Sequence, residues 1–282
     1  MSEVAGEEVR GGPQPTPPGS RRLVLQLVII VAILVVAAVV VAVVMLSQHP
    51  KAATAGSPGA PTPKNMASYG ALLTGKDGNI VTVRTPAVKL GHPVPTDASA
   101  HAGTANIVEF IDYQCPICLE FEETNLNNTA DLVASGKATL EIHPVSILDR
   151  SSQGTRYSSR AANAAACVAN FDPDEFLGVT AALYEYQPKE GSTGLTNAQL
   201  LKVLNVASAS SPSITKCVTS ETYKQWVTAT TDEANDGTFV HVAKSPAQFQ
   251  GTPSVFVNGV PYTGSVTDAA AFTAFVNAQA KG

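Results

Sequence analysis

The sequence predicts an α/β protein: a mixed β-sheet flanked by helices, with a helical insertion, preceded by one transmembrane helix. Three observations predict this class. Strand-length apolar segments alternate with helical segments after residue 79, a block of about 80 residues has helical periodicity, and a hairpin followed by a helix ends the chain. Alternation of strand and helix implies parallel pairing through a crossover, whereas a hairpin adds antiparallel strands.

Composition limits the function classes. Of 282 residues, 44% are hydrophobic and 15% are charged, and the net charge is −5. A mildly acidic chain has no general electrostatic attraction for nucleic acid, so we expect no nucleic-acid partner. The hydrophobic content also excludes a collagen-like or wholly disordered chain.

Residues 23–46 form an apolar run with one polar interruption, Gln26. As a helix this run is about 36 Å long, which exceeds a ~30 Å hydrocarbon core, and it is longer than the apolar region of a signal peptide. Arg10, Arg21 and Arg22 precede it, so the positive-inside rule places the N-terminus in the cytoplasm. We therefore expect a single-pass protein of the cell membrane whose C-terminal part lies outside the cytoplasm, where disulfides persist.

Composition then divides the rest of the chain. Residues 1–22 are rich in Gly, Pro and Glu and predict a disordered cytoplasmic tail, and residues 47–68 are rich in Pro, Ala, Gly and Ser and predict a flexible linker. Residues 69–282 are long enough for a sizeable core, and we expect one extracytoplasmic domain with the helical insertion at about 155–236.

The first half of this domain contains three candidate strands, at residues 79–84, 106–112 and 138–148. Each is an apolar run of strand length. Between the second and third strands, apolar residues recur at helical spacing and predict the buried face of a helix: Leu119, Leu126, Ala130 and Val133.

Helix starts follow in the insertion. Asp172 with Glu175, and Thr196 with Gln199, have the spacing of a capping box. Such boxes satisfy the first free N–H groups of a helix. The insertion is therefore predicted to contain several short helices.

The chain then returns to strands. Residues 254–257 and 260–263 flank an Asn-Gly pair, which is typical of a two-residue hairpin. Pro261 cannot donate to a ladder, so it predicts a strand at the sheet edge. Thr267 is the expected cap of a last helix.

The main chemical signal is Cys115-Pro116-Ile117-Cys118, at the junction of a strand and a helix. The positive end of the helix favours a thiolate at Cys115, and the thiolate is the nucleophile. Pro116 fits the first helical position, which needs no N–H donor. Cys118 lies three residues on, faces the same side, and can close a disulfide with Cys115.

Two other interpretations of this pair remain open. It could be half of a zinc site, with His143 and His241 as further ligands, but zinc usually takes four ligands and no second Cys-x-x-Cys is present. It could also be an inert structural bridge. Redox chemistry is the favoured interpretation, and we expect no metal and no organic cofactor.

Three segments together resemble the DsbA-like thioredoxin-fold proteins: residues 108–118 (VEFIDYQCPIC), the helical block, and residues 251–259 (GTPSVFVNG). The membrane-anchored form is similar to that of actinobacteria. The resemblance covers about residues 69–282 and implies a thioredoxin-like fold with thiol–disulfide oxidoreductase activity.

The resemblance also implies roles for single residues. Pro253 matches the cis-proline that packs beside the reactive disulfide, and Thr252 matches the residue whose backbone pairs with a bound substrate. Glu109 matches a buried acidic residue that exchanges a proton with Cys118. Asp112 is expected at the surface. Ile117 departs from the His of the best-known oxidases, so a less oxidising potential is expected.

Cys167 and Cys217 lie in the helical block, 50 residues apart. We expect a structural disulfide between them that ties the insertion together. Two buried free thiols, or a relay that passes electrons to the Cys115–Cys118 pair, are the alternatives.

The predicted function is a membrane-anchored oxidoreductase that introduces disulfides into unfolded secreted or cell-envelope proteins. The resemblance implies a membrane partner that reoxidises it, either DsbB or a protein like vitamin K epoxide reductase. Two alternatives are kept: a reductase or isomerase of the same fold, and a non-catalytic module that binds clients or a metal.

Overall fold

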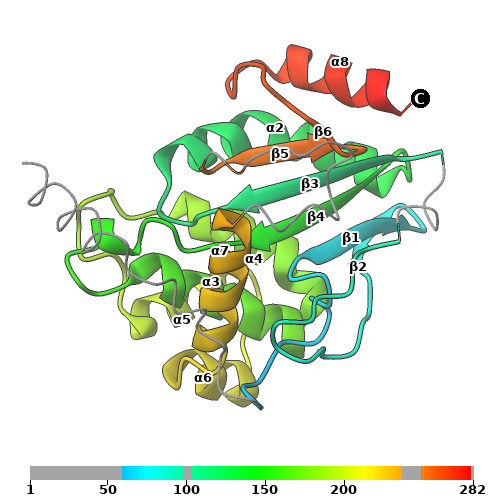
Figure 1. The fold of residues 1–282 in the computed structure, drawn as a ribbon. Coiled ribbons are helices and arrows are strands. Elements are labelled where there is room, and N and C mark those ends of the chain that lie inside the picture. The colour runs from blue at the N-terminus through cyan, green and yellow to red at the C-terminus, as the bar shows by residue number, and fades with distance from the viewer. Residues whose placement is uncertain (1–58, 98–102, 237–248, 250, 281–282) are drawn as a thin grey trace, which may run out of the picture. The chain divides into compact units, whose positions relative to one another are not determined.

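The computed structural model describes residues 59–97, 103–236, 249 and 251–280 (Figure 1). The predicted tail, the predicted span at residues 23–46 and most of the predicted linker lie outside these residues. Within them, every helix is too short or too polar to cross a membrane.

The structure has a thioredoxin-like α/β fold with a mixed sheet and helices. The strands are β1 Ala71–Lys76, β2 Asn79–Thr82, β3 Ala105–Ile111, β4 Ala138–Pro144, β5 Ser254–Val257 and β6 Val260–Pro261. The α-helices are α2 Pro116–Ala134, α3 Tyr157–Phe171, α4 Phe176–Glu185, α5 Asn197–Val206, α6 Pro212–Thr219, α7 Lys224–Asn235 and α8 Ala269–Gln279. Two 3-10 turns are η2 Asp149–Ser151 and η3 Pro173–Glu175.

The sheet has the strand order β2-β1-β4-β3-β5-β6. β3 and β4 are parallel and connected through α2, whereas the other neighbouring pairs are antiparallel. β6 is an edge strand, so Pro261 lies where the missing N–H is tolerated, as predicted. The helices α3 to α7 fall between β4 and β5, in the part of the chain where the insertion was expected.

Strand β1 is an element that the sequence analysis missed. It pairs with β2 through a turn at Asp77-Gly78, where both residues have positive φ (52° and 78°). An Asp-Gly turn of this kind is favoured in two-residue hairpins. Gly75 in β1 passes so close to the end of α2 that a Cβ would lie 2.2 Å from the Val133 carbonyl oxygen. The first strand expected, residues 79–84, is therefore the second strand of a hairpin and ends at Thr82.

The predicted buried face of α2 was wrong. Of its four residues only Val133 is buried, and the face that packs inward contains Cys118, Phe121, Glu122, Asn125, Thr129 and Val133. Three of these are polar, so hydrophobic periodicity indicated a neighbouring face. α2 packs against α8 and against β1 and β4, which places its N-terminal end at the C-terminal end of β3 (Figure 1).

Helix starts were predicted with mixed success. The capping box of Thr196 and Gln199 is present at α5. The segment after Asp172 instead forms the 3-10 turn η3, without a side-chain cap, and α4 begins at Phe176. At α8 the cap is Asp268, which accepts the Ala271 N–H, rather than Thr267.

The last residues of the predicted linker, 62–68, are mostly buried and belong to the folded domain. Met66 is fully buried, the Asn65 side chain donates to the Ala169 carbonyl at 2.8 Å, and the Lys64 N–H donates to Asn170 at 3.0 Å. This segment therefore packs on the C-terminal part of α3. Its composition resembles a spacer because most of the buried residues here are small or polar.

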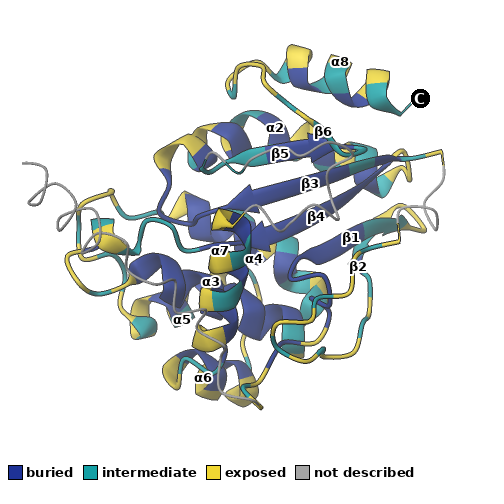
Figure 2. Ribbon diagram, viewed as in Figure 1, coloured by how far each residue is buried: buried dark blue, intermediate teal, exposed yellow. Residues whose placement is uncertain are grey.

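The core lies on both faces of the sheet, and β3 and β4 are buried along most of their lengths (Figure 2). Ile107 and Ile111 pack in the larger cluster, together with side chains of α2 and of the insertion. Val108 and Phe110 alternate with them and belong to a smaller cluster with Val145, Ala234 and Phe256. This alternation directs Glu109, on the same side as Ile107 and Ile111, toward the larger cluster.

Candidate active site at the start of helix α2

Cys115 is the N-cap residue of α2 and has an extended backbone (φ −76°, ψ 117°), with Pro116 at the start of the helix. β3 ends at Ile111, and a short turn delivers Cys115 to the positive end of the helix. Cys118 follows one turn later and is fully buried. Both cysteines are free thiols in the structure.

The two thiols differ sharply in acidity. The pKa of Cys115 is lowered to about 6, chiefly because the Cys118 thiol donates a hydrogen bond to it, while burial opposes the shift. The backbone N–H groups of Cys118 and Ile117 also lower the pKa of Cys115. Burial and the same Cys115 contact raise the pKa of Cys118 well above its ordinary value. At pH 7 Cys115 is therefore mostly a thiolate, and Cys118 remains a thiol.

The Thr252–Pro253 peptide bond is cis and lies next to this pair. In its protonated form, Cys115 donates its Sγ–H to the Thr252 carbonyl at 3.2 Å. The contact links residues 137 positions apart in the sequence and brings the segment before β5 against the start of α2. The cis bond is the one that the resemblance implied for Pro253.

Glu109 is buried in β3, and a second carboxyl, Glu122 of α2, lies beside it. Burial, together with the neighbouring Glu122, raises the pKa of Glu109 well above its usual range. Burial also raises the pKa of Glu122 to about 7. One carboxyl oxygen of each has no hydrogen-bond partner within the described part of the chain. The pair therefore holds a proton near neutral pH.

The sequence analysis missed Glu122. It lies four residues after Cys118, on the same buried face of α2. That spacing was the available signal. It was obscured because the buried face of this helix was assigned to apolar residues.

Asp112 is fully buried, which corrects its expected place at the surface. Its carboxylate accepts the N–H of Gln114 at 2.8 Å and the N–H of Leu148 at 2.9 Å. Burial raises the pKa of Asp112 to about 7, although these two hydrogen bonds oppose the shift. Asp112 therefore fastens the turn before Cys115 to the loop that follows β4.

The central dipeptide faces solvent. Pro116 is exposed, and Ile117 keeps 43% of its surface accessible. An exposed isoleucine contributes no charge to the neighbouring sulfur.

Cys167 and Cys217 form a disulfide that joins α3 to α6, with an S–S distance of 2.04 Å. Both are buried inside the insertion. The expected bridge is thus present, and the alternative of two free thiols is wrong.

The zinc interpretation finds no support in the described residues, which contain no group of three His, Cys, Asp or Glu side chains placed to hold a metal ion. His143 instead contacts Glu141 at 2.9 Å and stacks on Phe110. His241 lies outside the described residues.

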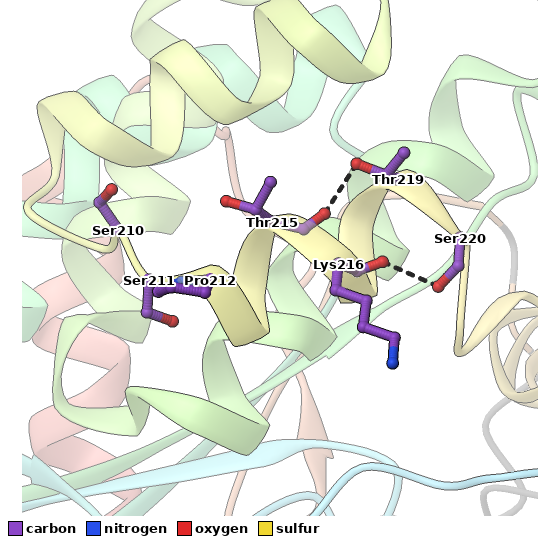
Figure 3. A pocket seen from close by; sticks show the side chains of 7 residues that line it. All are labelled: Ser210, Ser211, Pro212, Thr215, Lys216, Thr219 and Ser220. Atoms are coloured by element: carbon purple, nitrogen blue, oxygen red, sulfur yellow. Dashed lines mark hydrogen bonds between the residues drawn. The ribbon is translucent and has the colours of Figure 1, made fainter.

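An open pocket of about 650 Å³ lies along α6 and the residues before it (Figure 3). Hydroxyl groups and Lys216 line it. The hydroxyls of Thr219 and Ser220 donate to carbonyls of the same helix at 2.7 and 2.8 Å. No residue of the redox pair or of the cis-Pro segment lines this pocket, and we assign it no role in the reaction.

Comparisons with known proteins agree with this geometry. A thioredoxin family model matches residues 100–278. The reduced form of a disulfide bond oxidoreductase (DsbG) from Mycobacterium tuberculosis is 31% identical, with 63% of this chain and 79% of that chain covered and a TM-score of 0.52.

Two further solved structures are similar. Reduced DsbA from M. tuberculosis is 26% identical over 76% of this chain and 93% of its own, with a TM-score of 0.55. Oxidised BdbD from Bacillus subtilis is 20% identical, with 80% of this chain and 100% of that chain covered and a TM-score of 0.55. At this identity it supports the fold alone. A comparison with curated protein sequences found no match.

Proposed function

The chain belongs to the thioredoxin family and is a DsbA-like thiol–disulfide oxidoreductase, and from this premise we propose that it introduces disulfide bonds into secreted and cell-envelope proteins through Cys115 and Cys118. The observation that carries the proposal is the opposite acidity of the two thiols, one held as a thiolate at the helix start and the other buried as a thiol.

The reaction exchanges one disulfide for another. A client thiolate attacks Cys115 Sγ in the oxidised pair, the Cys115–Cys118 bond breaks, and Cys118 leaves as a thiolate that takes up a proton. A second client thiolate then attacks the client sulfur of the mixed disulfide and expels Cys115 as a thiolate. The client loses two electrons and gains a disulfide, and the enzyme becomes a dithiol.

Glu109 is the proposed source of that proton. Glu122 follows Cys118 by one turn on the buried face of α2, and Glu109 contacts Glu122. A pair of carboxyls that holds a proton near pH 7 can supply one to Cys118, and can take one back when Cys118 attacks a mixed disulfide.

The client is proposed to bind along the cis-Pro segment. Thr252 and Pro253 lie against Cys115, and the Thr252 carbonyl contacts its sulfur. An extended peptide placed here can pair with backbone groups and bring its own cysteine to Cys115.

Each cycle leaves the enzyme reduced, so a partner must reoxidise it. We propose a quinone-linked membrane protein of the DsbB or vitamin K epoxide reductase type, with no cofactor bound by this chain itself. The apolar run at residues 23–46 supports a single-pass anchor that holds the domain at the extracytoplasmic face, beside such a partner.

Refolding of a reduced client with native disulfides tests the direction. The oxidised protein should form the disulfides, and Cys115→Ser should abolish this while client binding persists. Disulfide reshuffling without net oxidation would instead indicate an isomerase, and assistance to refolding that Cys115→Ser retains in full would indicate a binding module.

Trapping of mixed disulfides tests whether Cys115 is the nucleophile and Cys118 the resolving thiol. Reduced Cys118→Ser should accumulate a mixed disulfide with a disulfide-containing client, because the resolving thiol is absent. Cys115→Ser should trap no client, since Cys118 is buried and protonated.

Membrane topology is tested in cells with two reporter fusions, alkaline phosphatase after residue 282 and a cytoplasmic reporter before residue 1. Activity of both, together with retention in the membrane fraction, supports the anchor. Release of a shortened chain from the membrane would show that the N-terminal segment is cleaved.

A further inference from the structure

The turn that carries Cys115 is held by side chains from the helical insertion. The Gln187 side chain, just beyond α4, donates its Nε2–H to the Cys115 carbonyl at 3.0 Å. Tyr184, near the end of α4, donates its hydroxyl to the Asp112 carbonyl at 3.3 Å, and the Cys115 N–H donates to the same oxygen at 2.9 Å. One helix end therefore binds both ends of the turn.

The Cys115 carbonyl is a sensitive place for such a contact. As the N-cap carbonyl it accepts the first hydrogen bond of α2, from the Leu119 N–H, and that bond is long at 3.2 Å. The carbonyl oxygen belongs to the same residue as the reactive sulfur, and its negative partial charge opposes a thiolate there. A second donor neutralises part of that charge and fixes the first helical turn.

The Gln187 amide is presented from a well-fixed position. Its own N–H donates to the Tyr184 carbonyl at 3.0 Å, and Pro188 follows, which stops the helix. Tyr184 is buried and packs on Tyr113, with ring centroids 5.4 Å apart. Tyr113 in turn is hydrogen-bonded to Thr180 of α4 at 3.1 Å.

We propose that Gln187 is a positioning residue through which the helical insertion holds the Cys115 carbonyl and keeps the neighbouring sulfur in its reactive form. Its hydrogen bond is to the carbonyl oxygen of Cys115 and not to the sulfur. Its action is through the N-cap carbonyl of α2. The inference rests on the proposed role of Cys115 as the nucleophile.

The test is Gln187→Met, which has similar length and cannot donate a hydrogen bond. The pKa of Cys115 is measured in the reduced full chain from thiolate absorbance and from the pH dependence of alkylation. We expect the pKa to rise and alkylation below that pKa to slow about threefold, a change within the range of one hydrogen bond. Gln187→Glu, which replaces the donor with a negative charge, should slow alkylation further.

Gln153→Met is the matched control, because the Gln153 side chain donates to the Gly191 carbonyl at 2.7 Å, a contact between the loop after β4 and the insertion that does not involve Cys115. It should leave the pKa of Cys115 unchanged. Thermal unfolding of each variant separates loss of stability from loss of thiolate character, since a purely structural role lowers the melting temperature alone.

Two failures are distinguishable. If the wild-type Cys115 titrates as an ordinary thiol, the proposed role of Cys115 as the nucleophile is overturned, and the proposed function with it. If the wild-type pKa is lowered and Gln187→Met and Gln187→Glu both leave it unchanged, only the role of Gln187 is overturned.

Discussion

At the scale of single residues, the site depends on buried groups that titrate near neutral pH. Cys115, Asp112 and Glu122 all have pKa values of about 6 to 7, by a lowered thiol pKa in the first case and raised carboxyl pKa values in the others. Each shift has a local cause, which is hydrogen bonding to the thiolate or removal of a carboxylate from water. A single substitution should therefore change each of these pKa values.

Replacement of Glu109 by Gln should slow resolution by Cys118. We expect a decrease of about tenfold, which is smaller than the roughly 100-fold or greater effect of removing a general acid–base group, because Glu122 remains. Decay of a preformed mixed disulfide between Cys115 and a labelled peptide measures this rate. Glu123→Gln, an exposed neighbour on α2, is the control, and equal rates for both variants would exclude the relay.

The buried carboxyl pair should make stability depend on pH. The pKa values of Glu109 and Glu122 are raised in the folded protein, so their contribution to stability is fully present below about pH 4, the unfolded value. It decreases as pH rises above that value, in the case of Glu122 through its folded pKa of about 7. Urea unfolding of the oxidised protein, in which Cys115 does not titrate, should show this decrease. Glu122→Gln should flatten the profile, and an unchanged profile would contradict the assignment.

Asp112→Ala should destabilise the fold. It leaves the Gln114 and Leu148 N–H groups without their acceptor, at a cost of about 1–3 kcal/mol for buried donors. Chemical unfolding measures the loss. Asp131→Ala, at an exposed position of α2, should change stability by less than about 0.5 kcal/mol.

At the scale of elements, the sequence predicted helix starts and strand positions correctly where a single residue type determines the local backbone geometry. The Thr196 capping box and the strand-edge position of Pro261 are of this kind. The buried face of α2 could not be predicted, because Glu122, Asn125 and Thr129 face inward and their burial is decided by partners distant in the sequence. Gln187 was missed for the same reason, since its partner Cys115 lies 72 residues away.

The disulfide between α3 and α6 should stabilise the insertion considerably. Closure of a 50-residue separation contributes about 4 kcal/mol in the chain-entropy model. The double variant Cys167→Ala/Cys217→Ala should lose about this much free energy of unfolding in urea while it keeps a redox-active Cys115–Cys118 pair. A loss below about 1 kcal/mol, or loss of redox activity in the folded variant, would point to another role for the bridge.

At the scale of the whole molecule, the exposed dipeptide sets how strongly oxidising the enzyme is. Ile117 adds no positive charge beside Cys115. The reduction potential should therefore be more negative, and the enzyme less oxidising, than DsbA, whose potential is about −120 mV. Equilibration with glutathione measures it. Ile117→His should raise the potential by about 30 mV, equivalent to a tenfold change in the equilibrium constant, whereas Ile117→Val should leave it unchanged.

The two ends of α3 contact different parts of the chain. At one end Ser158 hydrogen-bonds Gln114, the residue before Cys115, and at the other end Ala169 and Asn170 bind Asn65 and Lys64. Ser158 and Ala169 are separated by about 16 Å along the helix. A pull on the chain upstream of Lys64 would therefore act on the end of α3 that lies away from Ser158 and Gln114, and not directly on the turn that carries Cys115.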